Sequence, residues 1–275
     1  MPEGHVIHRL AHELNHSFAG HRVRVTSPQG RFASEAARLD GSILHHAEAW
    51  GKHLFLSFDV DAPANIVYIH LGLIGKLQFE PADARAGQIR LHIEHKEIAA
   101  NLRGPQWCRL VSEVEMESAV AKLGADPLRE HSPENAGKVE AVKRKVLRSS
   151  RPIGALLMDQ KLFAGVGNIY RAETLFRLGI SPFLPGKSVQ PEEFDTIWAD
   201  LTKLMKEGVV TGRIDTVAAE HTPEAMGRAP RKDDHGGEVY VYRRLGQPCY
   251  KCETPIAEMV MEGRNLFWCP TCQQQ

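Results

Sequence analysis

Four of the five cysteines form two close pairs near the carboxyl end of this 275-residue chain. Two residues separate Cys249 from Cys252 and Cys269 from Cys272, and sixteen residues lie between the pairs. Two such pairs at this separation are typical of a zinc ribbon, in which each pair lies on a tight turn and four thiolates converge on the metal. Four protein ligands close the coordination sphere, so we expect one structural Zn²⁺, which stabilises a hairpin too small to fold alone.

Composition excludes several classes of protein. The formal net charge is zero and the pI is near 7.2, so a nucleic-acid-binding signal has to be local. No stretch approaches the length of a membrane span, and the first residues lack the layout of a signal peptide. We therefore expect a cytoplasmic protein with no membrane partner. The fifth cysteine, Cys108, lies in a strand-like run and is expected in the core.

Hydrophobic periodicity divides the chain into a β-rich first part and a helical second part. Residues 5–18 fit an amphipathic helix, with four histidines on the face opposite the apolar one. That stripe could bind a metal, but it contains no carboxylate, and a solvated face is the better interpretation. The four histidines are His5, His8, His12 and His16.

Short alternating runs from residue 22 to about 112 predict an antiparallel sandwich or barrel.

Helical patterns follow at 114–124, 135–149, 152–159, 168–178 and 191–207. The stretch 208–238 is polar and rich in Gly and charge, which is typical of a mobile functional loop. We expect a first domain at 1–113, a linker at 114–134, a helical domain at 135–238 that includes this loop, and the zinc finger at 239–275.

Positive charge is concentrated in residues 137–171, where eight Lys and Arg residues face two acids. This local excess favours a polyanionic partner, although a single charge run is also typical of a solvated face. Within it, "AGVGNIYRAE" places Gly165 and Gly167 for a tight turn and Asn168 for capping the next helix. Helix amino ends attract phosphate, but the same pattern also fits an ordinary turn between helices.

Motifs spread along the whole chain resemble, in the same order, those of the formamidopyrimidine-DNA glycosylase/endonuclease VIII family. They are "MPEG", "GKHLF", "HLGLIGKL", "LLMDQKLFAGVGNIYRAETLFRLGISP" and "GQPCYKC…GRNLFWCPTCQ". The resemblance implies an α+β protein: an N-terminal antiparallel β-sandwich with an N-terminal helix, a C-terminal helix–two-turn–helix domain and a zinc-finger β-hairpin. The "MPEG" start and the absence of a Leu-Pro-Glu-Val run make it similar to the endonuclease VIII branch of the actinobacterial type.

The resemblance also implies a catalytic group at the amino end. Removal of the initiator Met leaves Pro2 with a secondary amine, and an α-amine of pKa about 8 is partly neutral and nucleophilic near pH 7. Attack on the anomeric carbon of a damaged nucleotide gives an iminium ion, after which the base departs and β,δ-elimination cuts the strand. Glu3 corresponds to an acid/base, and Lys52 to a lysine that contacts phosphate and assists catalysis. Without the resemblance, the dipeptide Pro2-Glu3 would not indicate a function.

Further residues correspond to the family's DNA contacts. His70, Asn168 and Arg264 match phosphate-contacting positions, and Arg264 also matches a residue of the catalytic group. Leu73 matches the apolar wedge that fills the space left by an everted base, although a leucine of the sandwich core fits the pattern equally well. Such contacts from separate elements would bend the duplex and ease base eversion.

Two departures from the family pattern bear on the substrate. Val6 stands where members usually carry an acid, and the stretch "LRGPQWCRL" is short, with Gln106 and Trp107 in place of an Arg/Phe void-filling loop. Both the short stretch and the resemblance to the endonuclease VIII branch favour oxidised pyrimidines over 8-oxoguanine as the substrate.

The expected partner is double-stranded DNA with oxidised bases or abasic sites, with single-stranded or bubble DNA as further substrates and a monomeric enzyme. Three alternatives stay open: a non-catalytic zinc-finger DNA-binding protein with the same fold, a glycosylase that prefers oxidised purines such as 8-oxoguanine, and a zinc-dependent hydrolase or nuclease. The closed set of four cysteines argues against the last.

Overall fold

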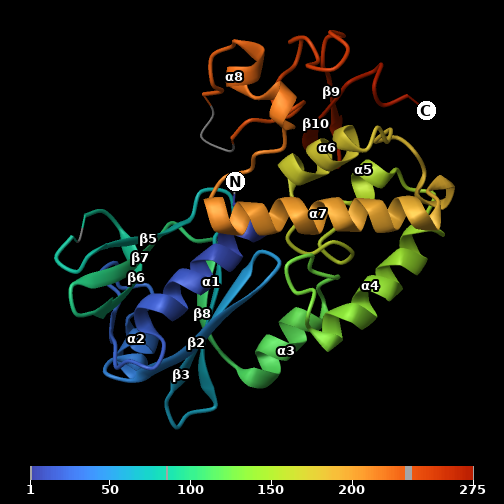
Figure 1. Cartoon of the computed structure of the whole chain (residues 1–275). Coiled ribbons are helices and arrows are strands. Elements are labelled where there is room, and N and C mark those ends of the chain that lie inside the picture. The colour runs from blue at the N-terminus through green and yellow to red at the C-terminus, as the bar shows by residue number, and fades with distance from the viewer. Residues whose placement is uncertain (1, 85, 233–236, 275) are drawn as a thin grey trace. The chain divides into compact units, whose positions relative to one another are not determined.

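A computed structural model describes residues 2–84, 86–232 and 237–274 of the chain. The fold divides into two compact units, unit 1 at Met1–Lys122 and unit 2 at Leu123–Gln275 (Figure 1). Each unit has its own hydrophobic core. Among the described residues, no helix is long and apolar enough to cross a bilayer.

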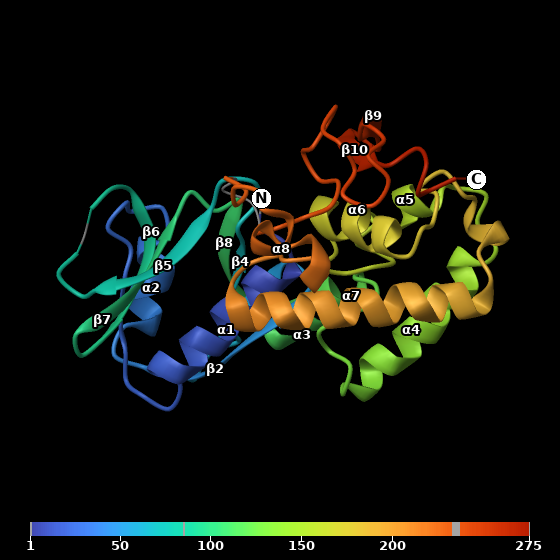
Figure 2. The ribbon, with the colours of Figure 1, turned by 45° about the horizontal axis from the view of Figure 1, so that its top comes forward.

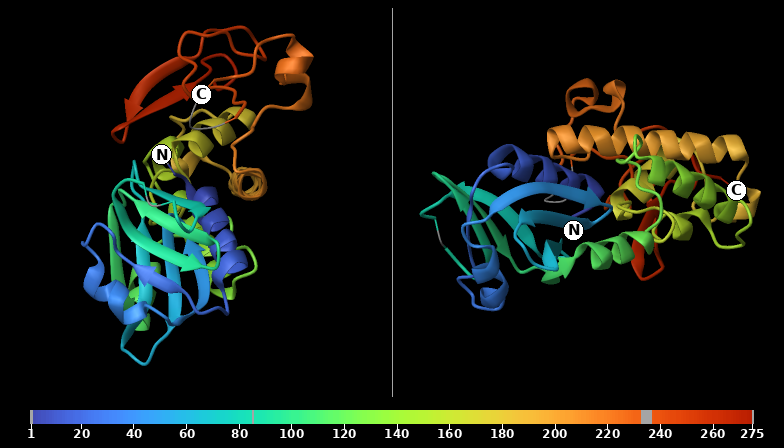
Figure 3. Two further views of the ribbon diagram at one scale, coloured as in Figure 1. Left: turned by 90° about the vertical axis from the view of Figure 1, so that its left-hand side faces the viewer. Right: turned by 90° about the horizontal axis from the view of Figure 1, so that it is seen from below.

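Unit 1 is a β-sandwich of two four-stranded antiparallel sheets, in the orders β1-β6-β7-β5 and β2-β3-β4-β8 (Figure 3). The inward-facing residues of both sheets are buried, and the pairing is antiparallel throughout, as the alternating pattern predicted. The strands are β1 (Arg24–Thr26), β2 (Ile43–Trp50), β3 (His53–Asp59), β4 (Ala64–His70), β5 (Lys76–Pro81), β6 (Ile89–His95), β7 (Ile98–Arg103) and β8 (Trp107–Ser112).

Three helices accompany the sandwich: α1 (Gly4–Phe18), α2 (Ala33–Leu39) and α3 (Glu113–Ala121). Helix α1 packs along β2 and β3, and its apolar side contributes Leu10, Leu14 and Phe18 to the core of unit 1. Cys108 lies in the same core, as expected, where burial raises the pKa of its thiol to about 12.

The prediction of a solvated histidine face on α1 is half wrong. His12 and His16 are exposed, but His5 and His8 are buried. The amino-terminal half of α1 is buried around more of its circumference than the rest of the helix, since Gly4, His5, Ile7 and His8 are all buried, so the polar face begins only further along. Burial, reinforced by the neighbouring His8, lowers the pKa of His5 to about 4. None of these histidines belongs to a metal-binding group among the described residues.

Unit 2 is built from helices and one small hairpin. Its elements are α4 (Pro133–Val146), α5 (Ile153–Leu156), α6 (Asn168–Arg177), η1 (Gly186–Ser188), α7 (Pro191–Thr211), η2 (Ala219–His221), α8 (Pro223–Met226), β9 (Ala257–Met261) and β10 (Arg264–Trp268). Helix α7 begins with a capping box between Gln190 and Glu193 and ends at Gly212 in the left-handed conformation. Its buried face joins α6, α4 and the hairpin in one core.

A fully buried carboxylate fixes the segment that leads from α8 to the zinc-binding hairpin. Glu173 of α6 accepts hydrogen bonds from the backbone amides of Tyr240, Val241 and Tyr242, at 2.7–2.9 Å, and from the Thr216 hydroxyl. Because four donors converge on one carboxylate, its desolvation is compensated and residues 240–242 are tied to α6.

Element boundaries differ from the expected domain limits in two places. The expected linker, 114–134, contains most of α3, and the limit between the two units lies after Lys122. The expected loop at 208–238 begins inside α7 and includes η2 and α8, while its residues 233–236 lie outside the described residues. The mobility of this loop stays a prediction.

Candidate active site

Lys52 lies in the two-residue turn that joins β2 to β3. Trp50 pairs with His53 across the turn, and Gly51 adopts φ +58°. A tight hairpin of this kind requires a positive φ, which glycine adopts without steric cost. The sequence therefore presents Lys52 at the end of a rigid two-stranded ribbon.

An aromatic cluster beside this turn contains the predicted His70. His70 ends β4, pairs with Trp107 of β8 and stacks on its indole with ring centroids 4.5 Å apart. The His53 ring lies 5.1 Å from that of His70, and its Nδ1 is hydrogen-bonded to the Tyr68 hydroxyl. The structure thus brings Lys52 and His70, which are eighteen positions apart in the sequence, to one end of one sheet.

Electrostatics keep both histidines of the cluster neutral near pH 7. Burial, followed by the charges of His70 and Lys52, lowers the pKa of His53 to about 4. Burial and the charge of Lys52 likewise lower the pKa of His70, against a smaller opposite effect of a hydrogen bond with Gln106. The Gly72 amide donates to His70 Nδ1 at 3.1 Å, so the neutral ring carries its hydrogen on Nε2. His70 is therefore a fixed Nε2–H donor.

Leu73 lies at the tip of a tight turn after β4 and is 57% exposed. This placement excludes the alternative that it is a leucine of the sandwich core. The next residue, Ile74, is 80% exposed. Gly72 at φ +70° and the bond from the Gly75 amide to the Leu71 carbonyl shape the turn. Sequence reasoning missed Ile74, although two large apolar residues between glycines in "GLIG" were a visible signal.

Pro2 and Glu3 directly precede α1. Glu3 is the N-cap residue, its carbonyl accepts the first helical hydrogen bond from the Val6 amide at 3.0 Å, and its side chain is buried. Pro2 is partly exposed. The helix thus holds the dipeptide at its amino end, where the macrodipole favours a carboxylate.

In unit 2, Asn168 is the first residue of α6 rather than its cap. Gly167 occupies the N-cap position, and no side chain caps the helix. The Asn168 amide instead donates to the Asn265 carbonyl at 2.8 Å and accepts from Arg171, whose guanidinium is fully buried. The prediction of a capping role is wrong because these partners occupy both ends of the amide.

The Asn265 carbonyl belongs to the zinc-binding hairpin, where β10 pairs with β9 (Figure 2). Glu262 and Gly263, both at positive φ, form its turn, and Arg264 is the first residue of β10. Arg264 therefore stands one residue beyond the tip of the hairpin. The hydrogen bond of Asn168 to Asn265 places the two predicted phosphate contacts next to one another within unit 2.

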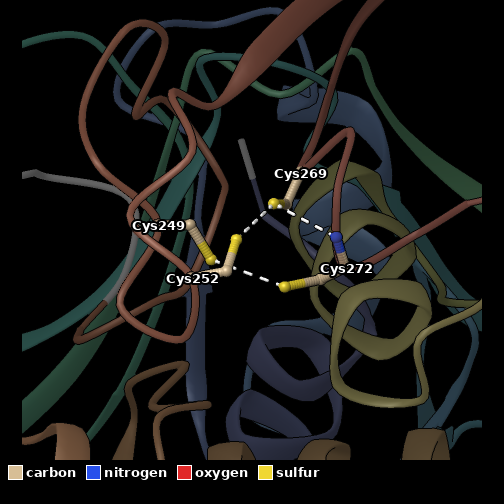
Figure 4. A group of neighbouring side chains, drawn as sticks. All are labelled: Cys249, Cys252, Cys269 and Cys272. Carbon is tan, nitrogen blue, oxygen red and sulfur yellow. Dashed lines mark hydrogen bonds between the residues drawn. The ribbon is translucent and has the colours of Figure 1, made fainter.

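Four cysteine side chains converge at the other end of this hairpin (Figure 4). Their sulfur atoms lie within 4.8 Å of one another, with Cys252 and Cys269 at 3.4 Å and Cys249 and Cys272 at 3.9 Å. Sulfur ligands about 2.3 Å from a tetrahedral Zn²⁺ would lie about 3.8 Å apart, so the set fits the ion. Cys249 and Cys269 are buried, as a structural site requires.

Internal ion pairs offset part of the basic segment 137–171. Lys143 pairs with Asp195 at 2.6 Å, and Arg151 pairs with Asp159 and Glu262 at 3.1 Å. Of its eight basic residues, the exposed ones without an ion pair among the described residues are Arg144, Lys145, Arg148 and Lys161. The segment is therefore less positive at its surface than its composition predicts.

Three parts of the chain match the domains of one known protein family. Residues 1–107 match the formamidopyrimidine-DNA glycosylase N-terminal domain, residues 123–219 the formamidopyrimidine-DNA glycosylase H2TH domain, and residues 246–275 the zinc finger found in FPG and IleRS. Over 99% of its length, the chain is 45% identical to proteins named Endonuclease 8 1 from Mycobacterium tuberculosis and Mycobacterium bovis, and the match covers all of each. The chain belongs to the formamidopyrimidine-DNA glycosylase/endonuclease VIII family. It is accordingly a DNA-binding DNA glycosylase with AP-lyase activity, an enzyme of base-excision repair.

Solved structures of this family share the fold. The chain superimposes on MutM (FPG) of Thermus thermophilus with a TM-score of 0.73 at 27% identity, covering 99% of this chain and 98% of that one. Lactococcus lactis Fpg, solved with DNA that contains an abasic site, gives a TM-score of 0.77 at 20% identity over 99% of this chain and all of that one. The sandwich, the helical domain and the zinc-finger hairpin of the glycosylase are therefore as predicted.

Proposed function

We propose that this glycosylase excises oxidised pyrimidines through a covalent intermediate on Pro2. The amine nitrogen forms a bond to C1′ of the damaged nucleotide as the bond from C1′ to the base breaks, and the amine loses its proton. The C1′–O4′ bond then breaks as O4′ is protonated, which opens the sugar ring and leaves an iminium ion between Pro2 and C1′. The positive charge acidifies the C2′ hydrogen, and its loss expels the 3′ phosphate by β-elimination. A second elimination then expels the 5′ phosphate.

Three further residues of unit 1 would act together with Pro2. Glu3, adjacent in sequence, protonates the ring oxygen or the departing base and takes a proton back later. Lys52 supplies a positive charge to the phosphate beside the lesion. His70 adds a neutral Nε2–H donor to the same phosphate, a role supported by its hydrogen bond from Gly72 and by the nearby Lys52 charge.

Unit 2 would contact the phosphate backbone of DNA through Asn168 and Arg264. The exposed Leu73 of unit 1 would enter the space left by the everted base. The exposure of both Leu73 and Ile74 supports an apolar wedge of two side chains. Asn168 already bonds to Arg171 and Asn265, so its contribution to phosphate binding depends on exchanging one of these bonds or adding to them.

The observation that carries the substrate assignment is the 45% identity, over essentially the whole chain, to proteins named Endonuclease 8 1. The short stretch "LRGPQWCRL", with Gln106 and Trp107, supports it, since it offers little to read the opposite strand. We infer that duplex DNA is the main substrate of a monomeric, cytoplasmic enzyme that associates with the nucleoid, and that single-stranded and bubble DNA are also cut.

Borohydride trapping on abasic duplex tests the covalent step. The wild-type enzyme should become linked to DNA under reduction, and a protein with one extra residue before Pro2 should not, because its proline nitrogen is then an amide. Mass spectrometry of the intact protein verifies which terminus is present. An enzyme with a free Pro2 that leaves abasic DNA uncut and unlinked would leave only the DNA-binding alternative.

A cleavage panel tests the substrate. Duplexes with thymine glycol, dihydrouracil, 8-oxoguanine, uracil and a bare abasic site should be cut at rates that place the oxidised pyrimidines above 8-oxoguanine. Faster cutting of 8-oxoguanine would favour the purine alternative.

Asn168→Ala and Arg264→Ala should weaken binding to every duplex alike and flatten the salt dependence of binding, since phosphate contacts carry no sequence information. Unchanged affinity for abasic duplex would remove those assignments.

A further inference from the structure

The aromatic cluster of unit 1 lies on the outer face of the sheet β2-β3-β4-β8. Successive side chains of a strand point to opposite faces, and Leu54, Ile69 and Cys108 belong to the core of unit 1. Their neighbours along β3, β4 and β8 therefore lie on the other face, where the register brings the strands side by side. The rings of the cluster are His53, Tyr68, His70 and Trp107.

His70 has a ring on each side of it in this cluster, because β4 lies between β3 and β8 in the sheet. The Trp107 indole stacks on the imidazole of His70, with ring centroids 4.5 Å apart and 29° between the planes. The His53 ring meets the same imidazole edge-on, with centroids 5.1 Å apart and 73° between the planes. Two contacts of different geometry therefore fix both the position and the tilt of the His70 ring.

His53 is itself held by a hydrogen bond. Its Nδ1 is bonded to the Tyr68 hydroxyl, and the two rings stack with centroids 5.6 Å apart. Tyr68 in turn stacks on Phe55, which is fully buried, with centroids 4.6 Å apart. A chain of contacts thus leads from a buried phenylalanine through Tyr68 and His53 to His70.

Packing alone does not call for an imidazole at position 53. A polar ring that is partly removed from water needs a hydrogen-bond partner, and an apolar side chain of similar size would fill the space without one. The hydrogen bond with Tyr68 gives the His53 ring a defined orientation, which an apolar side chain would lack. An oriented ring can hold its neighbour in a single orientation too.

The free protein already contains a partner for the donor of His70. Because Nδ1 accepts from the Gly72 amide, the side-chain hydrogen bond between His70 and Gln106 uses the Nε2–H. A phosphate oxygen that replaced the Gln106 oxygen would meet a donor with a fixed direction. A group that is ordered before binding loses less conformational freedom on contact, which strengthens binding.

We propose that His53 is a positioning residue of this enzyme. Held by the Tyr68 hydroxyl, its ring orients the His70 imidazole so that the Nε2–H is directed to a phosphate oxygen of DNA. This inference rests on the proposed role of His70 in phosphate binding.

Equilibrium binding tests the coupling of His53 to His70 without requiring catalysis. The probe is a continuous duplex with a tetrahydrofuran abasic analogue, which cannot be cut. His53→Ala, and Tyr68→Phe as a milder change that removes only a hydroxyl, are each measured in the wild-type enzyme and in combination with His70→Ala. The matched control is His46→Ala, which removes an exposed histidine of β2 in the same sheet. Thermal melting establishes that each variant is folded, and Tyr68→Phe decides the test if His53→Ala is not.

His53→Ala should weaken binding about threefold to tenfold in the wild-type enzyme and leave it nearly unchanged where His70 is already replaced, since residues in contact act non-additively. Tyr68→Phe should give a smaller loss with the same dependence on His70. His46→Ala should bind DNA as the wild-type enzyme does. Equal losses with and without His70 would overturn the inference and leave the role of His70 in place.

The salt dependence of binding separates an effect on His70 from an effect on Lys52. The pKa of His53 is about 4 and that of His70 is also lowered, so at pH 7 neither ring neutralises a phosphate charge. The slope of log K against log salt should therefore stay at its wild-type value in His53→Ala. A slope reduced by about 0.9 would show that His53 acts through the charge of Lys52, and the assignment to His70 would be wrong. Unchanged affinity of His70→Ala alone is a separate result, since it would remove the proposed phosphate contact and the inference with it.

Discussion

Individual side chains in the aromatic cluster of unit 1 determine how the enzyme responds to acid. His53 is hydrogen-bonded to Tyr68 and is affected by Lys52 and His70, so its protonation would bury a positive charge close to the charge of Lys52. Its pKa is about 4 in the folded state, against 6.5 as the ordinary value. The unfolded chain therefore binds more protons than the folded one between these values, and stability falls as pH falls through this window.

We predict that His53 alone makes the folded state less stable by on the order of 3 kcal/mol on going from pH 7 to pH 4. Urea denaturation at half-unit steps of pH measures this change. His53→Gln should flatten the profile relative to wild type, although it lowers stability at pH 7. His12→Gln, at an exposed position of α1, is the control and should keep the wild-type profile. A wild-type pH profile in His53→Gln would contradict the role of this ring.

Residue types at fixed spacing were predictable from the sequence, whereas partners distant along the chain were not. The spacing of the four cysteines follows from a local pattern that tolerates few alternatives. Asn168 before a helix predicts a cap, but its amide bonds to Asn265, ninety-seven positions away. His5 and His8 fit a polar helix face, and only the tertiary structure encloses them. Local periodicity contains no information about such long-range contacts.

At the scale of elements, the Glu173 carboxylate links α6 to the strand-like segment 240–242, which precedes the zinc site. Glu173→Gln keeps the shape but places an NH₂ group where an oxygen now accepts from backbone amides that cannot themselves accept. We predict a loss of about 2–4 kcal/mol in the free energy of unfolding of unit 2, because a buried network loses its charge and at least one acceptor.

Glu192→Gln in the first turn of α7 is the matched control, since Glu192 is exposed and the change should stay within about 0.5 kcal/mol. Denaturation followed by far-UV circular dichroism compares the two variants. If Glu173→Gln proved as stable as Glu192→Gln, the carboxylate would not be what fixes this segment.

At the scale of the whole molecule, the two units bury separate cores that share no residue. The core of unit 1 contains Cys108, whereas Cys249, Cys269 and Phe267 of the zinc hairpin are part of the core of unit 2. Loss of zinc should therefore destabilise all of unit 2 and not only its hairpin, because metal binding and folding are coupled. It should leave unit 1 unaffected.

We predict that calorimetry of the full chain shows two unfolding transitions and that a strong zinc chelator lowers the temperature of only one. Cys269→Ala should lower that same transition without chelator, because it removes a ligand together with a buried side chain. Cys108→Ala, the matched substitution in the other core, should lower the other transition by a small amount and leave zinc content unchanged, since it removes one buried sulfur atom at a cost of about 1 kcal/mol. A single transition that shifts as a whole under both substitutions would show that the two cores unfold as one cooperative unit, and the separation of zinc-dependent from zinc-independent stability would then be wrong.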